Sequence, residues 1–386
     1  MYKARLVFFA ACLGLLLFGI GLITLGSVAT GLHDKFSLDE LTAGTLFSIM
    51  PFGILTGSLI FGPLCDKYGY KLFLVISCLC MFGGFQGIAY ASNIDLLKIS
   101  IFLFGIAGGA INGATNGVVA DISMKNKAAN LSLLGVSFAI GALGMPFILG
   151  AFNERYSFSV ILSSVGFLAL FAAVFFIIIK FPPPKQKQGI PVLQGVKLFR
   201  DNFILLIAFF LFCQSSYEAI INNWTTTFLI EQLDVSRSAA LYSLSLYVVG
   251  MALTRLVVGS VFRSVKPEVV MYASLALLLV GATLLRLNYS FPVSVTGLIL
   301  TGAGLASGFP VMLGFVGERY TDLSATAFSF VLVIALTGNI LITYSMGLIA
   351  QFYGISNLTL VTYVLNAAML LLTIFILRET KITTNK

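Results

Sequence analysis

The sequence has few charged residues: Asp, Glu, Lys and Arg make up 10% of its 386 residues, whereas soluble domains carry about 25%. A soluble protein of this length needs many charged side chains to cover its surface. The shortage excludes an ordinary soluble globular protein and indicates that most of the surface faces lipid. Histidine is also scarce. His33 stands alone, with no cysteine or carboxylate cluster beside it, which argues against a transition-metal site.

Other absences narrow the function further. The five cysteines include no C-x-x-C pair, so they predict neither a metal site nor a disulfide framework. No Walker A loop is present, which argues against drive by ATP. The chain also lacks paired acids or a nucleophile–base pair of the kind that an enzyme would use. We therefore expect neither an enzyme nor a bound cofactor.

Long apolar runs are abundant, and a spanning helix needs about 20 mostly apolar residues. Twelve runs meet this length: Leu6–Leu32, Leu41–Gly62, Leu72–Ala91, Leu96–Ala120, Ala128–Phe152, Ser157–Phe181, Phe203–Ile230, Ala239–Phe262, Val269–Leu287, Phe291–Val316, Ala325–Ala350 and Leu358–Leu377. The first run is too long for the apolar core of a signal peptide, and no A-x-A site follows it. It is interpreted as the first span. The predicted fold class is an all-α membrane protein with twelve transmembrane helices.

A polar break divides the twelve spans into two sets of six. It contains Pro182, Pro183 and Pro184, and proline does not continue a helix. The expected organisation is an N-terminal six-helix half over residues 1–181, a cytoplasmic linker over 182–202 and a C-terminal six-helix half over 203–386. The other breaks between spans are short and leave no room for a separate soluble domain.

The two halves repeat with a constant spacing of 197 residues. Residues that recur at this spacing are Gly53 and Gly250, Gly62 and Gly259, Gly105 and Gly302, Gly117 and Gly314, Asp121 and Glu318, Gly141 and Gly338, and Tyr156 and Tyr353. Parallel six-span repeats are typical of one transporter architecture, which binds substrate between the halves near the membrane midplane. The repeat therefore favours a transporter over a channel.

Lys and Arg are distributed unevenly between the alternate loops. If the N-terminus is inside, most of them fall in inner loops, and the outer loops hold only Lys35, Lys98, Arg155, Arg237 and Arg286. By the positive-inside rule we expect a multi-pass protein of the cell (inner) membrane with both termini cytoplasmic. This asymmetry accounts for the net charge of +8. Since there is no basic soluble face, we expect no nucleic-acid partner.

The loop after the second span carries a specific pattern. It reads Gly62-Pro63-Leu64-Cys65-Asp66-Lys67-Tyr68-Gly69-Tyr70-Lys71 and resembles the signature G-x-L-a-D-r-x-G-r-K of the major facilitator superfamily. Gly69 allows a tight turn, while Asp66, Lys67 and Lys71 can lock two helix ends by charge and release them when the halves move. The gating residues predicted here are Gly62, Asp66, Lys67, Gly69, Lys71 and, near the degenerate second copy, Arg255. The plainer interpretation is a positively charged inner loop.

Two further spans carry candidate substrate contacts. Asn112 and Asn116 lie four apart in the fourth span, where asparagine either bonds neighbouring helices together or lines a central cavity. In the seventh span Glu218 is the acid that lies well inside an apolar run, and such an acid is a functional candidate by default. The other candidates in this span are Gln214, Tyr217, Asn222, Asn223 and Trp224. Amides and aromatic rings together suit a sugar, although a polar cluster that only holds helices together would look the same.

Tyr217-Glu218 with Trp224 six residues later resembles the seventh span of the fucose-permease-like branch, which contains sugar:proton symporters. The run Leu131-Ser132-Leu133-Leu134-Gly135 is similar to the fifth span of that branch, which usually has Asn in place of Ser132 and His in place of Gly135. The better-known symporters of this branch have an acid where Asn112 stands and another in the first span, which has none here. The resemblance implies sugar transport, and these missing acids depart from its usual proton-coupling scheme.

Together these features predict a secondary transporter that moves a small polar organic solute, most simply a sugar, by alternating access. Glu218 is the candidate for proton coupling, and sodium is the other coupling ion considered. The alternative within the same superfamily is an efflux pump for amphipathic compounds, which the 35 phenylalanines and the single intramembrane acid would permit. The expected partners are the small-molecule substrate and the lipid bilayer, and we expect a monomer.

Overall fold

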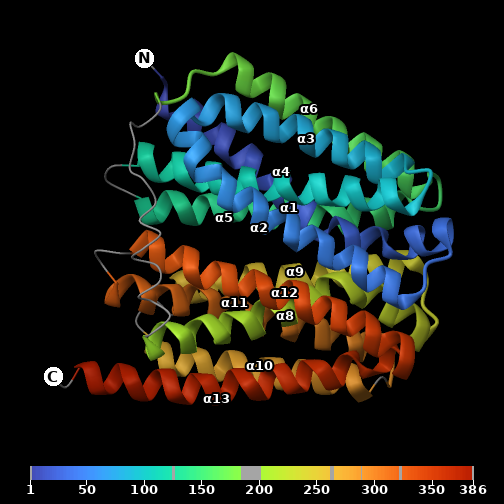
Figure 1. The fold of residues 1–386 in the computed structure, drawn as a ribbon. Helices are drawn as coiled ribbons and strands as arrows, with labels where there is room; N and C mark the ends of the chain where they lie inside the picture. The colour runs from blue at the N-terminus through green and yellow to red at the C-terminus, as the bar shows by residue number, and fades with distance from the viewer. Residues whose placement is uncertain are drawn as a thin grey trace. The chain divides into compact units, whose positions relative to one another are not determined.

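The computed structural model describes residues 2–123, 127–183, 201–260, 265–287, 289–320 and 324–384. The described chain is helical (Figure 1). Its helices are α1 (Ala4–Phe36), α2 (Glu40–Tyr68), α3 (Tyr70–Tyr90), α4 (Ile94–Ile122), α5 (Lys127–Phe152), α6 (Phe158–Ile178), α8 (Asn202–Leu233), α9 (Arg237–Ser260), α10 (Pro267–Leu287), α11 (Phe291–Arg319), α12 (Ser324–Tyr353), the short 3₁₀ helix η2 (Ile355–Asn357) and α13 (Leu358–Thr384).

Within the described residues, twelve helices are long and apolar enough to cross a membrane, which confirms the predicted fold class. Several helices extend beyond the apolar runs. For example, α8 continues to Leu233 and α11 to Arg319. Hydrophobicity marks the part of a helix that lies within the hydrocarbon core of the membrane, whereas capping groups set where the helix begins. Asp39 accepts a hydrogen bond from the Thr42 backbone N–H at 3.0 Å, and Asn93 does the same for Leu96 at 2.8 Å.

Contacts divide the chain into two compact units, and each is described separately. The first unit comprises Met1–Gly189 and Arg237–Ser245, and the second comprises Ile190–Ser236 and Leu246–Lys386. Helix α9 therefore begins in the first unit and continues in the second. The predicted linker, 182–202, lies largely outside the described residues.

In the first unit, helices cross closely at glycine residues. At the crossing of α2 and α4, a Cβ at Gly105 would collide with the Met50 carbonyl oxygen and lie 3.0 Å from the Cα of Gly53. At the crossing of α1 and α5, a Cβ at Gly141 would collide with the Leu16 carbonyl oxygen. Small residues let helix backbones approach closely inside membranes. Gly105 and Gly109 of α4 thus pack against the backbone of α2.

The second unit repeats these crossings with the residues that the 197-residue spacing pairs. A Cβ at Gly302 in α11 would collide with the Tyr247 carbonyl oxygen in α9, and one at Gly250 in α9 would collide with that of Ile299. A Cβ at Gly338 in α12 would lie 2.6 Å from the Phe212 carbonyl oxygen in α8. The sequence repeat is therefore a repeat of helix packing, with α9 and α11 crossing as α2 and α4 do.

Candidate functional site

A polar cluster surrounds the middle of α8 in the second unit. The aspartate before α8, Asp201, caps the helix by accepting a hydrogen bond from the Phe203 N–H at 2.9 Å. Gln214, Glu218 and Asn222 are four residues apart and lie on one face of the helix. Gln214 and Asn222 are buried, whereas Glu218 is half-buried. Glu218 therefore lies well inside a span, and part of its side chain is nevertheless accessible.

Gln214 is anchored to the neighbouring helix α11. Its side-chain Nε2 donates a hydrogen bond to the Leu305 carbonyl oxygen at 3.0 Å. Its Oε1 lies against Gly308, where a Cβ would collide with it. Gly308 therefore provides the space in which the Gln214 amide fits. One half of this amide fixes α8 to α11, and the other half supplies an acceptor inside the cluster.

Tyr217 is fully buried and lies among hydroxyl groups from two other helices. Its own hydroxyl interacts with those of Thr301 in α11 and Thr362 in α13. Neither contact has the geometry of a normal hydrogen bond, since the Tyr217 Oη has no such partner among the described residues. The hydroxyl of Thr362 donates to the Thr359 carbonyl oxygen at 2.8 Å.

Glu218 interacts electrostatically with Arg255 of α9. Arg255 is exposed, and its Nε donates a hydrogen bond to the Ala306 carbonyl oxygen of α11 at 3.2 Å. The buried hydroxyl of Tyr247 interacts with Glu218, Arg255 and Tyr217. The assignment of Arg255 to the gate remains a prediction. The structure adds the electrostatic interaction with Glu218, which the sequence analysis did not anticipate.

Several polar atoms of this cluster are buried without a hydrogen-bond partner in the described part of the chain. They are Gln214 Oε1, Tyr217 Oη, Tyr247 Oη, Thr301 Oγ1 and Ser307 Oγ. Buried polar atoms are normally satisfied, because leaving one without a partner costs about 1–3 kcal/mol. A group of them on α8, α9 and α11 is therefore suited to binding water or the hydroxyl groups of a solute.

The other α8 candidates are more enclosed than a sugar-binding surface requires. Only 1% of Trp224 is exposed, and Asn222 and Asn223 are also buried. The indole ring does not present a face on which a solute could stack in this conformation. The roles of these three residues in substrate binding remain predictions. Tyr247, Thr301, Ser307 and Thr362 were missed, because a lone hydroxyl in an apolar run carries no signal in the sequence.

Asn112 and Asn116 lie in the first unit, on α4, and are half-buried. Asn116 Nδ2 donates to Asn112 Oδ1 at 3.0 Å and to the Asn112 carbonyl oxygen at 2.9 Å. These bonds join two residues of one helix, whereas the interhelical interpretation requires bonds to another helix. Their role in substrate binding remains a prediction.

The signature loop forms the tight turn between α2 and α3. Gly69 has φ 81°, a conformation that favours glycine, and its N–H donates to the Cys65 carbonyl oxygen at 2.8 Å. Lys67 and Lys71 are exposed, and the Lys67 amine lies 5.0 Å from the centre of the Tyr68 ring. The Asp66 side chain lies outside the described part of the structure, so the charge lock remains a prediction.

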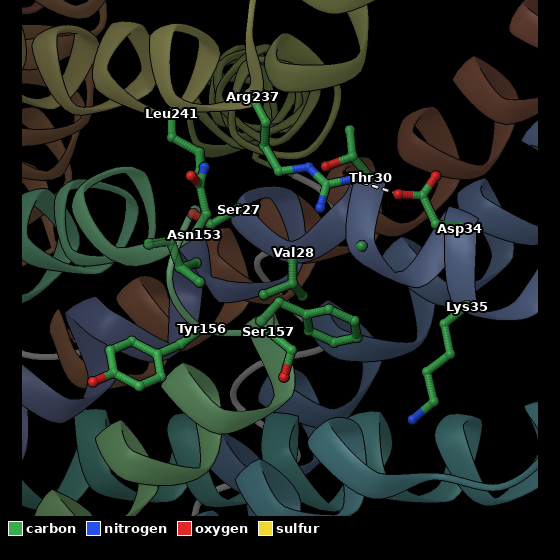
Figure 2. Close-up of a pocket in the computed structure, with 13 residues that line it drawn as sticks. Ser27, Val28, Thr30, Asp34, Lys35, Asn153, Tyr156, Ser157, Arg237 and Leu241 are labelled. Atoms are coloured by element: carbon green, nitrogen blue, oxygen red, sulfur yellow. Dashed lines mark hydrogen bonds and ion pairs between the residues drawn. The ribbon is translucent and has the colours of Figure 1, made fainter.

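A separate cavity of about 310 Å³ lies in the first unit, between α1, α5 and the start of α9. Figure 2 shows Arg237 of α9 reaching the carboxylate of Asp34 in α1. Ser238, next to Arg237, donates to Asn153 Oδ1 at 3.0 Å. The sequence analysis used Arg237 only for membrane orientation. It missed the ion pair because its partners are 203 residues apart.

Comparison with known proteins identifies the family. The model of the Major Facilitator Superfamily matches residues 11–285. The 4-hydroxybenzoate transporter PcaK of Acinetobacter baylyi is 38% identical over 93 residues, which are 24% of this chain and 20% of that protein. A D-xylose transporter of Levilactobacillus brevis is 28% identical over 175 residues, 44% of this chain and 37% of that protein. The matched regions thus span well under half of either relative.

The fold of this chain is also similar to that of solved transporter structures. The crystal structure of a D-xylose-proton symporter superposes with a TM-score of 0.79 at 13% identity, covering 96% of this chain and 97% of that one. These matches agree with the signature loop and with the twelve spans. The chain therefore belongs to the major facilitator superfamily, and it is a multi-pass membrane transporter rather than an enzyme.

Proposed function

We propose that this transporter moves a small polar organic solute, most simply a sugar, by alternating access, and that it couples this movement to a proton through Glu218. The observation that carries the proposal is the position of Glu218. It is half-buried at the middle of α8, within electrostatic range of Arg255. Near it in the same cluster are buried polar atoms that have no hydrogen-bond partner among the described residues. A carboxyl group with a charged neighbour and partial access to water is suited to taking up and releasing a proton.

The polar surroundings support a hydroxylated solute. Amide and hydroxyl groups on α8, α9 and α11 offer hydrogen-bond acceptors and donors near the middle of these helices. Those that have no hydrogen-bond partner among the described residues favour a ligand that can form hydrogen bonds with them. The D-xylose transporter that matches 44% of the chain agrees with this class. We include Asn112, Asn116, Asn222, Asn223 and Trp224 in the proposed site.

The experiment is uptake into proteoliposomes with an imposed proton gradient, using D-xylose as the first probe. Glu218→Gln keeps the shape of the side chain but cannot carry a proton. It should abolish uphill accumulation while exchange of labelled for unlabelled solute continues. Glu154→Gln, at an exposed acid outside the spans, is the matched control and should behave as wild type. Proton-driven accumulation at the wild-type level in Glu218→Gln would refute the coupling role.

A second candidate substrate class is an aromatic hydroxycarboxylate. Arg255 presents an exposed guanidinium beside Glu218, and guanidinium groups bind carboxylates well. The 4-hydroxybenzoate transporters among the relatives fit this chemistry. Arg255→Gln separates the two classes. It should abolish uptake of 4-hydroxybenzoate if the carboxylate binds Arg255, whereas binding of an uncharged sugar should persist.

We also propose that the signature loop acts as a gate that locks and releases the ends of α2 and α3. In this proposal both termini are cytoplasmic. The halves 1–181 and 203–386 are the two bodies that move during alternating access. The turn at Gly69 and the exposed amines of Lys67 and Lys71 support the gate. Asp66→Asn tests it, because the substitution removes the charge and nearly preserves the shape. It should impair uptake while the protein still inserts at a normal level, and unchanged uptake would remove the gating role.

A further inference from the structure

A second cavity lies at the opposite end of α3 from its junction with α4. Its volume is about 440 Å³, and it is lined by Tyr2, Tyr68, Gly69, Tyr70, Lys71, Lys180, Phe181, Pro182 and Pro183. These residues come from the start of the chain, the turn between α2 and α3, and the segment after α6. The N-terminus and the end of α6 lie at the same end of the first unit (Figure 1). The cavity is therefore at the level where these spans leave the membrane.

The charge of the cavity lining is positive. Lys71 and Lys180 are both exposed, and neither forms an ion pair with an acid in the described part of the chain. Among the other lining residues, the Tyr70 hydroxyl donates a hydrogen bond to Asp121 Oδ2 at 2.8 Å. Tyr2 and Tyr68 are exposed. Lysines beside tyrosines at a helix end are typical of the membrane–water interface.

Two columns of exposed apolar side chains start at this cavity and run along the spans. On α3 the column is Leu72, Ile76 and Leu79, which begins next to Lys71. On α6 it is Phe171, Val174 and Ile178, which ends just before Lys180. The two helices pack together, since the rings of Phe82 and Phe167 lie 5.3 Å apart. A molecule whose anionic end sits between the two lysines could therefore lay apolar chains along α3 and α6.

We propose that this cavity binds the headgroup of an anionic phospholipid, with Lys71 and Lys180 on its phosphate and with the acyl chains along the exposed columns of α3 and α6. Basic pockets between transmembrane helices are suited to such headgroups. The apolar columns favour a lipid over free phosphate, because a soluble anion would make no use of them. The site adjoins Gly69, so a bound headgroup would also contact the turn between α2 and α3.

Lipid binding by the purified full-length protein tests the proposal. Short-chain phosphatidylglycerol is titrated in detergent while bound lipid is counted by native mass spectrometry. Phosphatidylcholine serves as the zwitterionic comparison, and glycerol phosphate is the headgroup without chains. The test variant is K71Q with K180Q. The control variant is K98Q, at the opposite end of the same unit, where the lysine lies 3.7 Å from Asp95.

Phosphatidylglycerol should bind more tightly than phosphatidylcholine to the wild type and to K98Q. Each of the two cavity substitutions should weaken it about fivefold, which corresponds to about 1 kcal/mol per basic residue. Both lysines are exposed, so the variant should fold, and an unchanged unfolding temperature without lipid checks this. An equal preference for phosphatidylglycerol in the K71Q, K180Q variant would overturn the proposal. If glycerol phosphate bound as tightly as phosphatidylglycerol, the proposal of a lipid site would be refuted, and the cavity would be a site for small anions.

Discussion

Arg255 of α9 lies within electrostatic range of Glu218 of α8 and at the same time donates a hydrogen bond to α11 through Ala306. The Ala306 carbonyl thus holds a cation within electrostatic range of an acid at the middle of α8. This arrangement links three helices of the second unit around one carboxyl group. It also means that a change in the charge of Glu218 alters the electrostatic environment of Arg255 directly.

We predict that Glu218 and Arg255 are energetically coupled. In a double-mutant cycle of Glu218→Gln and Arg255→Gln, the losses in unfolding free energy should not add. The coupling energy should be about 0.5–1 kcal/mol, at the low end of the range for interacting pairs, because Arg255 is exposed. Denaturant unfolding in detergent at pH 7 measures it. Additive effects within error would show that the two charges do not interact.

The helix crossings predict which glycines tolerate a methyl group. Gly302→Ala should destabilise the protein by about 1–3 kcal/mol, because the new Cβ would collide with the Tyr247 carbonyl oxygen. Gly105→Ala should do the same at the matching crossing of the first unit. Gly314, in the same helix as Gly302, has nothing within 4 Å of the position that an added Cβ would take. Gly314→Ala should be neutral or slightly stabilising, since alanine favours helices. Thermal unfolding compares the three variants, and a similar loss in Gly314→Ala would contradict the crossing argument.

Tyr320 should make a contribution to stability that is lost at alkaline pH. Its hydroxyl donates to Asp201 Oδ2 at 2.6 Å, and burial followed by the carboxylate of Asp201 raises the pKa of Tyr320 above its usual value. A raised pKa in the folded state means that the contribution is complete below about pH 10, the unfolded value, and declines as the pH rises through the folded value.

Tyr320→Phe should therefore lower the unfolding free energy by about 1 kcal/mol between pH 7 and pH 9. The difference from wild type should shrink above about pH 10. Tyr289→Phe, at a tyrosine that is 79% exposed, is the control and should have little effect at any pH. A constant difference between Tyr320→Phe and wild type across the whole range would contradict this assignment.

The ion pair between Asp34 and Arg237 should limit access to the cavity beside α1. Asp34→Asn should raise the rate at which a membrane-impermeant maleimide labels Ser27→Cys, a lining position, by about two- to fivefold. This range follows from the worth of an exposed ion pair, about 0–1 kcal/mol. At about 1 M salt the pair is screened, so wild-type and Asp34→Asn backgrounds should then label equally. Labelling that is insensitive to both the substitution and salt would exclude such a role.

The class of the protein, its spans and its family could all be predicted from the order of its residues. An apolar run is a local property, so Leu96–Ala120 already predicted the helix that extends over Ile94–Ile122. The 197-residue spacing of Gly53 with Gly250 and of Gly105 with Gly302 anticipated the repeated crossing. Glu218 was also identifiable, because an acid in the middle of an apolar run is costly wherever the helix packs.

The groups that surround that acid could not be predicted in this way. Arg255 and Tyr247 come from another helix, α9, and their proximity to Glu218 depends on how the spans pack. The same holds for Asp34 and Arg237, which are 203 residues apart, and for Lys71 and Lys180, which share one cavity. Hydrophobicity determines that a helix lies in the membrane, but it does not determine which helices pack against it. That depends on the complementary shapes of the helix surfaces, as at the close approach of Gly302 to the Tyr247 backbone.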